Sequence, residues 1–248
     1  MKSDFLKKIL PIKKREAEAL QLKLKRNVFL ELFDDSSRVI FIGEIKPKSP
    51  NMESTVQTDF VEQAKMYAES GVDAISVLTD ETFFGGSLKL LAQIRTVVDV
   101  PLLMKDFVLD EAQIVAGLKA GASTVLLIVD FLEEKRLTQL VAFCHRVGIE
   151  PLVEIQDERE LDIAVRAGAK VIGVNSRNLR TLEIDVDRAL RVVSTASQFL
   201  PTLFLSSIQS RVDVEAALEA GARGVLVGTT LMNSENVAKT LKHLKGEE

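Results

Sequence analysis

A repeated pattern constrains the fold of this chain more than any other feature: a short apolar run, a polar residue at its C-terminal end, then a helical stretch. Eight such runs occur along the 248 residues, each rich in Val, Ile and Leu. They cover residues 39–46, 74–78, 101–105, 124–129, 151–155, 171–175, 202–206 and 224–228. Continuous apolar runs of this length are typical of strands buried on both faces of a parallel sheet.

Amphipathic stretches separate most of the runs. They include residues 110–119, 133–147, 158–167 and 212–220. A glycine ends several of these segments just before the next run, where positive φ favours glycine; these are Gly71, Gly121, Gly148, Gly168 and Gly221. The pattern predicts one helix between successive strands.

The fold class that follows is α/β, a single (β/α)8 TIM barrel domain spanning residues 1–248. An open, doubly wound sheet is the alternative. It would need a phosphate-binding glycine fingerprint after the first strand, and Gly43-Glu-Ile-Lys-Pro is not one. Residues 1–38 form an N-terminal helical extension, with an amphipathic helix expected over 4–24, interrupted by Pro11, and a short helix over 28–36.

Composition excludes several classes of protein. The net charge of −4 gives no sign of nucleic-acid binding, and no run approaches the roughly 18 apolar residues of a membrane span. Cys144 is the only cysteine, so an internal disulfide is excluded. His145 and His243 lack a carboxylate at ligand spacing, so we expect no metal. The N-terminus lacks the features of a secretory signal, and we expect a cytoplasmic protein.

Charged and polar residues stand at the C-terminal ends of four runs. Glu44 and Lys46 end the first and share a face, because side chains alternate along a strand. Lys105, Glu154 and Asn175 end the third, fifth and sixth. Active sites of (β/α)8 barrels lie at this end of the strands, so we expect these groups to converge as a set of acids and bases whose pKa values perturb one another.

The last two runs predict a phosphate site. Ser206 ends the seventh run and Ser207 follows it; Gly228 ends the eighth run and Thr229 follows it, before a short helical stretch. Loops after strands seven and eight commonly hold phosphate in these barrels, through free amides and close backbone approach at glycine. A phosphorylated small-molecule substrate is therefore expected.

With these residues laid out, the chain resembles the indole-3-glycerol phosphate synthase family from about residue 39 to 235. The motifs that carry the resemblance are Gly-Glu-Ile-Lys-Pro-Lys-Ser-Pro at 43–50, Ser-Val-Leu-Thr-Asp-Glu-Thr-Phe-Phe-Gly-Gly-Ser at 76–87, Leu-Met-Lys-Asp-Phe at 103–107, Pro-Leu-Val-Glu-Ile at 151–155 and Ile-Gly-Val-Asn-Ser-Arg-Asn-Leu-Arg-Thr-Leu-Glu at 172–183. The family acts in tryptophan biosynthesis and closes an indole ring from 1-(2-carboxyphenylamino)-1-deoxyribulose 5-phosphate, losing carbon dioxide and water without a metal or organic cofactor.

The resemblance implies a role for each matching residue. Lys105 would be the general acid, Lys46 would bind the substrate carboxylate and assist dehydration, and Glu44 and Glu154 would stabilise developing positive charge and move protons. The residues implied in substrate binding are Ser49, Phe84, Phe107, Arg177, Leu179 and Ser206, with Asn175 orienting the substrate, and those implied in phosphate binding are Lys46, Ser207, Gly228 and Thr229. The family is compatible with a monomer and with association with other tryptophan-pathway enzymes.

Two segments depart from the family pattern. Leu205-Ser206-Ser207 replaces the usual Glu-Ser-Gly, and Ser49-Pro-Asn-Met-Glu replaces Ser-Pro-Ser-x-Gly. Loss of one carboxylate makes the site more positive, which favours a lowered lysine pKa and predicts reduced turnover. Two alternatives stay open on the same scaffold: an aldolase that forms a Schiff base through a lysine, and a non-catalytic barrel that binds a phosphorylated ligand.

Overall fold

The computed structural model describes residues 9, 11–15, 27–48 and 59–247 and shows a closed barrel of eight parallel strands in chain order. The strands are β1 (Ile40–Ile45), β2 (Ala74–Leu78), β3 (Leu102–Lys105), β4 (Thr124–Ile128), β5 (Leu152–Ile155), β6 (Ile172–Asn175), β7 (Thr202–Leu205) and β8 (Gly224–Val227). Pairing of β1 with β8 closes the sheet. The (β/α)8 fold is confirmed, the open sheet is excluded, and every strand lies within one residue of its predicted run.

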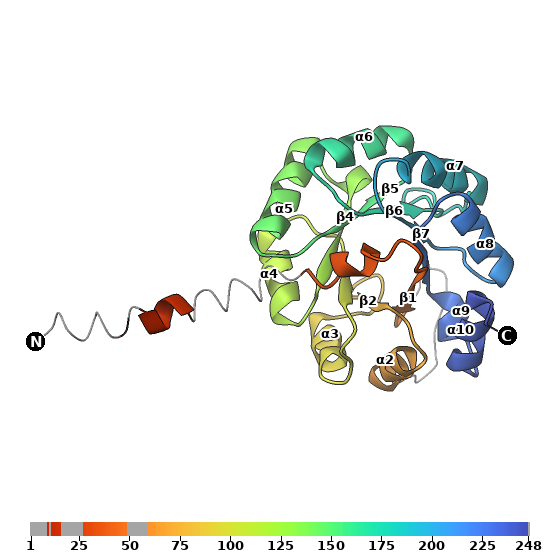
Figure 1. Cartoon of the computed structure of the whole chain (residues 1–248), viewed down its shortest axis with the longest axis horizontal. Helices are drawn as coiled ribbons and strands as arrows, with labels where there is room; N and C mark the ends of the chain where they lie inside the picture. The colour runs from red at the N-terminus through yellow and green to blue at the C-terminus, as the bar shows by residue number, and fades with distance from the viewer. Residues whose placement is uncertain (1–8, 10, 16–26, 49–58, 248) are drawn as a thin grey trace, which may run out of the picture.

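Helices surround the strands in a ring (Figure 1). They are α2 (Phe60–Glu69), α3 (Leu88–Arg95), α4 (Glu111–Lys119), α5 (Glu134–Arg146), α6 (Glu158–Ala167), α7 (Val186–Ala196), α8 (Arg211–Glu219), α9 (Thr229–Met232) and α10 (Val237–Lys245). The five glycines predicted to end helices all have positive φ, between 84° and 101°. The polypeptide therefore turns into each following strand where only glycine does so without strain.

The barrel interior is filled by apolar side chains. Ile42, Leu103, Leu126 and Leu226 belong to one buried cluster inside the barrel, and a second, larger cluster lies between the strands and the surrounding helices. Truncating one such leucine to alanine is expected to cost about 2–5 kcal/mol of stability. The interior is thus a packed core and not a channel.

A 3-10 helix, η1 (Leu30–Phe33), closes the N-terminal end of the barrel. Phe29 and Phe33 are buried in the interior cluster, and Arg223, which precedes β8, donates a hydrogen bond to the carbonyl of Asp35 at 2.5 Å. The short helix predicted over 28–36 is therefore one 3-10 turn. Residues 9 and 11–15 are helical, and the rest of the helix expected over 4–24 lies outside the described residues.

A buried carboxylate with two partners also lies at this N-terminal end. The carboxylate of Glu150, just before β5, is fully buried and contacts Nε2 of His145 at 3.0 Å and Nζ of Lys170 at 3.6 Å. His145, which was expected to lack a carboxylate partner, thus has one five residues away. No group of His, Cys, Asp and Glu side chains that could hold a metal ion occurs among the described residues.

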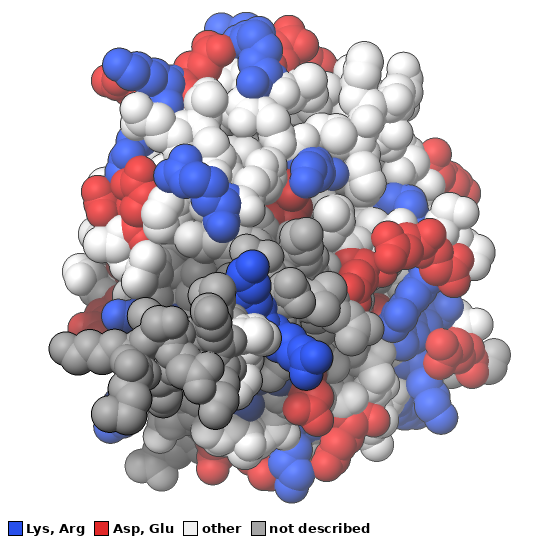
Figure 2. All heavy atoms as spheres, turned by 60° about the vertical axis from the view of Figure 1, so that its left-hand side comes forward, with Lys and Arg blue, Asp and Glu red and all other residues white. Residues whose placement is uncertain are grey.

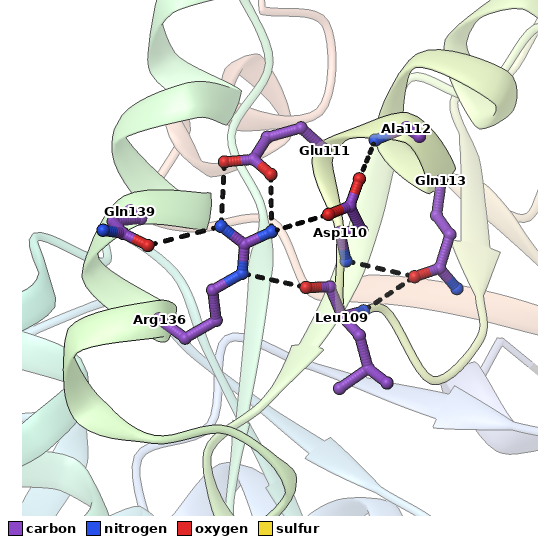
Figure 3. A network of polar contacts seen from close by, with 7 residues as sticks. All are labelled: Leu109, Asp110, Glu111, Ala112, Gln113, Arg136 and Gln139. Carbon is purple, nitrogen blue, oxygen red and sulfur yellow. Dashed lines mark hydrogen bonds and ion pairs between the residues drawn. The ribbon is translucent and has the colours of Figure 1, made fainter.

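Arg136 of α5 ties that helix to the start of α4 (Figure 3). Its guanidinium pairs with Glu111 at 2.5 Å and with Asp110 at 3.1 Å, and Nε donates to the carbonyl of Leu109 at 2.9 Å. Because this segment follows β3, the network fixes the connection that leaves the strand carrying Lys105.

Charges of both signs cover the surface of the described residues. On the face drawn in Figure 2, Lys and Arg side chains lie among Asp and Glu side chains rather than forming one basic surface. No helix in the described ranges is both long enough and apolar enough to cross a lipid bilayer.

Candidate active site

Glu44 links the two lysines at the C-terminal end of the barrel. Its Oε1 lies 3.3 Å from Nζ of Lys46, and its Oε2 lies 3.2 Å from Nζ of Lys105. Glu44 is 4% exposed, so the carboxylate sits between two ammonium groups with little water around it. Ion pairs in such an environment are stronger than at the surface.

The pKa values of Glu44 and Lys105 are both shifted in this cluster. Burial would raise the pKa of Glu44, but Lys105 and Lys46 outweigh it and hold that pKa below its usual range. Burial would lower the pKa of Lys105, but the charges of Glu44 and Glu154 raise it above its ordinary value, against a smaller opposing effect of Arg177. Two carboxylates therefore suffice to keep Lys105 protonated at neutral pH. The lowering expected from the missing carboxylate is relative to a site with three carboxylates, and it stays a prediction.

Glu154 and Asn175 form a second polar pair. Nδ2 of Asn175 donates to Oε1 of Glu154 at 2.9 Å, and Oδ1 of Asn175 accepts the backbone N–H of Arg177 at 3.0 Å. Burial raises the pKa of Glu154 despite the opposing charge of Lys105 and the hydrogen bond from Asn175. Within the described residues, its Oε2 is buried without a hydrogen-bond partner, so one acceptor of this carboxyl group is left unsatisfied.

Aromatic rings line the same end of the barrel. The ring centroids of Phe84 and Phe107 are 6.3 Å apart, and Phe131 meets Phe107 edge-on at 5.3 Å. Phe107 and Leu179 also pack against the interior cluster. Phe131 ends η2 (Val129–Phe131), a 3-10 turn after β4, and sequence reasoning missed it because a lone aromatic after an apolar run gives no signal of its own.

The end of β7 carries the departures from the family pattern. Leu205 is 1% exposed and fills the barrel interior against Gly173, where an added Cβ would lie 2.7 Å from its Cδ1. Ser206 and Ser207 follow with φ of 72° and 61°, a left-handed conformation that L-residues adopt at a cost. The hydroxyl of Ser207 lies 2.8 Å from that of Ser176.

Gly228 brings the end of β8 against the charged residues. It precedes α9, and a Cβ at this position would lie 2.7 Å from Oε1 of Glu44. A side chain at residue 228 would therefore displace the Glu44 carboxylate. Thr229 begins α9, and Ser49 lies outside the described residues.

The long segment after β6 is anchored across the barrel opening. Arg180 pairs with Asp130 after β4, with nitrogen–oxygen distances of 2.9 and 2.7 Å. Nη1 of Arg177 donates to the carbonyl of Leu182 at 2.9 Å. The ion pair joins residues fifty positions apart, so no local pattern could have indicated it.

A closed (β/α)8 barrel with two lysines and two glutamates at the C-terminal ends of its strands has the form of an enzyme that works by acid–base chemistry. Residues 4–244 match the family model described as indole-3-glycerol phosphate synthase. Proteins named indole-3-glycerol phosphate synthase from Streptococcus pneumoniae strains CGSP14 and 70585 are 40% and 39% identical to this chain over 252 aligned residues, covering 99% of it and 98% of each relative. The chain belongs to the indole-3-glycerol phosphate synthase family.

Proposed function

We propose that this protein is an indole-3-glycerol phosphate synthase of tryptophan biosynthesis, a carboxy-lyase that closes the indole ring of 1-(2-carboxyphenylamino)-1-deoxyribulose 5-phosphate with loss of carbon dioxide and water. Family membership over nearly the whole chain supports this. The observation that carries it is the Glu44 carboxylate held between Lys46 and Lys105. This arrangement keeps a protonated acid in a largely buried site.

Lys105 is the general acid in this proposal. Its raised pKa, caused by Glu44 and Glu154 overcoming burial, keeps it charged at neutral pH. It can therefore polarise the substrate ketone while the arene carbon attacks. Two adjacent carboxylates favour its reprotonation afterwards.

Glu154 and Lys46 serve the later proton transfers. The raised pKa of buried Glu154 brings its proton exchange closer to neutrality, and its unpartnered Oε2 faces no competing donor among the described residues. Lys46 binds the substrate carboxylate and assists dehydration, Glu44 stabilises developing positive charge, and Asn175 orients the substrate through its place beside Glu154.

Binding of the substrate is divided between an apolar wall and a phosphate site. The Phe84–Phe107 pair and Leu179 supply apolar surface for the aromatic ring. The other proposed substrate contacts are Ser49, Arg177 and Ser206, and the proposed phosphate contacts are Lys46, Ser207, Gly228 and Thr229. The approach of Gly228 to Glu44 supports a phosphate site adjoining the acid–base groups.

The proposal includes reduced turnover, because Leu205 supplies no charge where the family pattern has a glutamate. It also includes a cytoplasmic, monomeric enzyme formed by one domain, able to associate with other enzymes of the pathway. A Schiff-base aldolase is not favoured, because such a lysine needs a lowered pKa and that of Lys105 is raised.

The test is a fluorescence assay of indole-3-glycerol phosphate formation by wild type, Lys105→Ala and the control Lys119→Ala, which removes an exposed lysine of α4. Loss of the acid should lower kcat by about 10²–10⁴-fold, whereas the control should retain wild-type rates. Circular dichroism checks that both variants fold. Absence of product from wild type would reject the proposed function, and equal rates for Lys105→Ala and wild type would remove Lys105 from the mechanism.

A further inference from the structure

We infer that Arg188 is a positioning residue that holds the ends of β5 and β6 together and thereby sets the hydrogen bond between Asn175 and Glu154. This inference rests on the proposed function. Arg188 lies in the first turn of α7. Its Nη2 donates to the carbonyls of Asn175 at 2.9 Å and Ser176 at 3.1 Å, and its Nη1 donates to the carbonyl of Gln156.

These carbonyls lie at the C-terminal ends of two adjacent strands. Asn175 is the last residue of β6, and Gln156 directly follows β5, two positions after Glu154. The guanidinium group is planar and presents its donors in fixed directions. One such group bonded to both backbones therefore fixes the separation of the two strand ends, on which the 2.9 Å Asn175–Glu154 contact depends.

A second contact holds the same backbone from the other side. The N–H of Gln156 donates to Oε2 of Glu160 at 2.7 Å. The peptide units on either side of Gln156 are thus held by α6 through Glu160 and by α7 through Arg188. The position of Glu154 is therefore set by two helices as well as by its strand.

Lysine should not replace this arginine. An ammonium group is a compact charge on a flexible stem, so it does not hold carbonyls of two strands in one plane. The hydrogen bonds of the Arg188 guanidinium all go to backbone carbonyls at the ends of β5 and β6, so its effect on the reaction passes through Glu154 and Asn175. The expected signature is a change in rate and in pH dependence with little change in substrate affinity.

The experiment compares Arg188→Lys with the control Arg191→Ala, an exposed arginine of the same helix. In Arg188→Lys we expect kcat to fall roughly 10- to 100-fold, with KM within about twofold of wild type because direct substrate contacts are unchanged. Weakening the Asn175 hydrogen bond removes an interaction that lowers the pKa of Glu154. The acid limb of the kcat profile should therefore move to higher pH. Arg191→Ala should match wild type.

A double-mutant cycle tests whether Arg188→Lys lowers kcat through the Asn175–Glu154 hydrogen bond. In an Asn175→Ala background, Arg188→Lys should lower kcat by less than about threefold further, because the bond that it sets is already gone. An equal fall in both backgrounds, or a wild-type rate and pH profile in Arg188→Lys, would overturn the inference. Carboxyl carbon NMR titration of Glu154 supplies a readout independent of turnover. If wild type forms no product, the proposed function fails, while an unchanged Glu154 titration in Arg188→Lys would separately reject the positioning role.

Discussion

Gly228 lies against Glu44 so closely that a Cβ at residue 228 would be 2.7 Å from the carboxylate oxygen Oε1. The same oxygen is 3.3 Å from Nζ of Lys46. The backbone directly after β8 therefore forms one wall of the space in which Glu44 meets the lysines. The rate should be sensitive to a single methyl group at this position.

Gly228→Ala should lower kcat/KM by about tenfold or more, because the carboxylate must move away from the ammonium groups. The backbone at residue 228 has φ of −104° and ψ of −90°, outside the helical and extended regions, so retention of the fold is checked together with the rate. Steady-state kinetics with circular dichroism measure both effects. Wild-type kinetics in a folded Gly228→Ala protein would show that the position of Glu44 is not limiting.

Leu205→Glu should raise turnover. A carboxylate at the end of β7, whose register partner is Asn175, would restore the family's charge at this position and could stabilise positive charge that develops during the reaction. Stability should fall by a few kcal/mol, because a buried apolar side chain is exchanged for a charge. Leu205→Gln is the matched control without the charge. Equal kcat in wild type, the glutamate variant and the glutamine variant would contradict the proposal of reduced turnover.

Glu160→Gln should change how stability depends on pH. Burial raises the pKa of Glu160 to about 7, against the hydrogen bond from the Gln156 N–H. The folded protein then retains a proton that the unfolded chain has released, so its free energy of unfolding falls as pH rises from about 4.5 to about 7. For this partly exposed group the loss is about 1–2 kcal/mol after allowance for solvent screening. Urea denaturation at pH 5 and pH 8 should show that loss in wild type and not in Glu160→Gln.

Ser207→Gly should be more stable than Ser207→Ala by about 1 kcal/mol. Both variants lose the 2.8 Å hydroxyl contact with Ser176, but only glycine adopts the φ of 61° at residue 207 without steric cost. Chemical denaturation of the two variants isolates the backbone contribution. Equal stability, or greater stability of the alanine variant, would contradict strain at this position.

Phe131→Ala should raise KM several-fold and change kcat less, because a ring at the edge of the aromatic wall contributes binding that the ground state and transition state share. Its loss removes the 5.3 Å edge contact that supports Phe107. Phe199→Ala, which removes an exposed ring before β7, is the control. A KM that is unchanged in Phe131→Ala would exclude this residue from substrate binding.

The strands were predictable because a sheet that is buried on both faces requires continuous apolar runs in the sequence. Val125 and Leu127 face the outer cluster while Leu126 and Ile128 face the interior, so no polar alternation interrupts the run. The same continuous apolar run made the end of β4 hard to predict. Val129 was predicted as strand, but it begins η2. An apolar residue does not indicate where a strand ends.

The candidate site was predictable where its residues end strands and not where contacts join distant segments. Glu44, Lys105 and Glu154 follow from position alone, because parallel strands end on one side. The contacts of Arg188 and the Arg180–Asp130 pair depend on helix orientation and on folding of the segment after β6. The raised pKa of Lys105 depends on two carboxylates from different strands, which no count of charges reveals.

Phe29 and Phe33 close the N-terminal end of the barrel, opposite the candidate active site. Residues that contribute to thermal stability there are distinct from the residues proposed to react. These two aromatic residues lie a full strand length from the proposed reacting groups. Thermal stability and catalytic rate can therefore be altered independently. Attachment to a solid support, or substitutions that improve packing, should therefore be made at the N-terminal end of the barrel, where they leave the entry of substrate unobstructed.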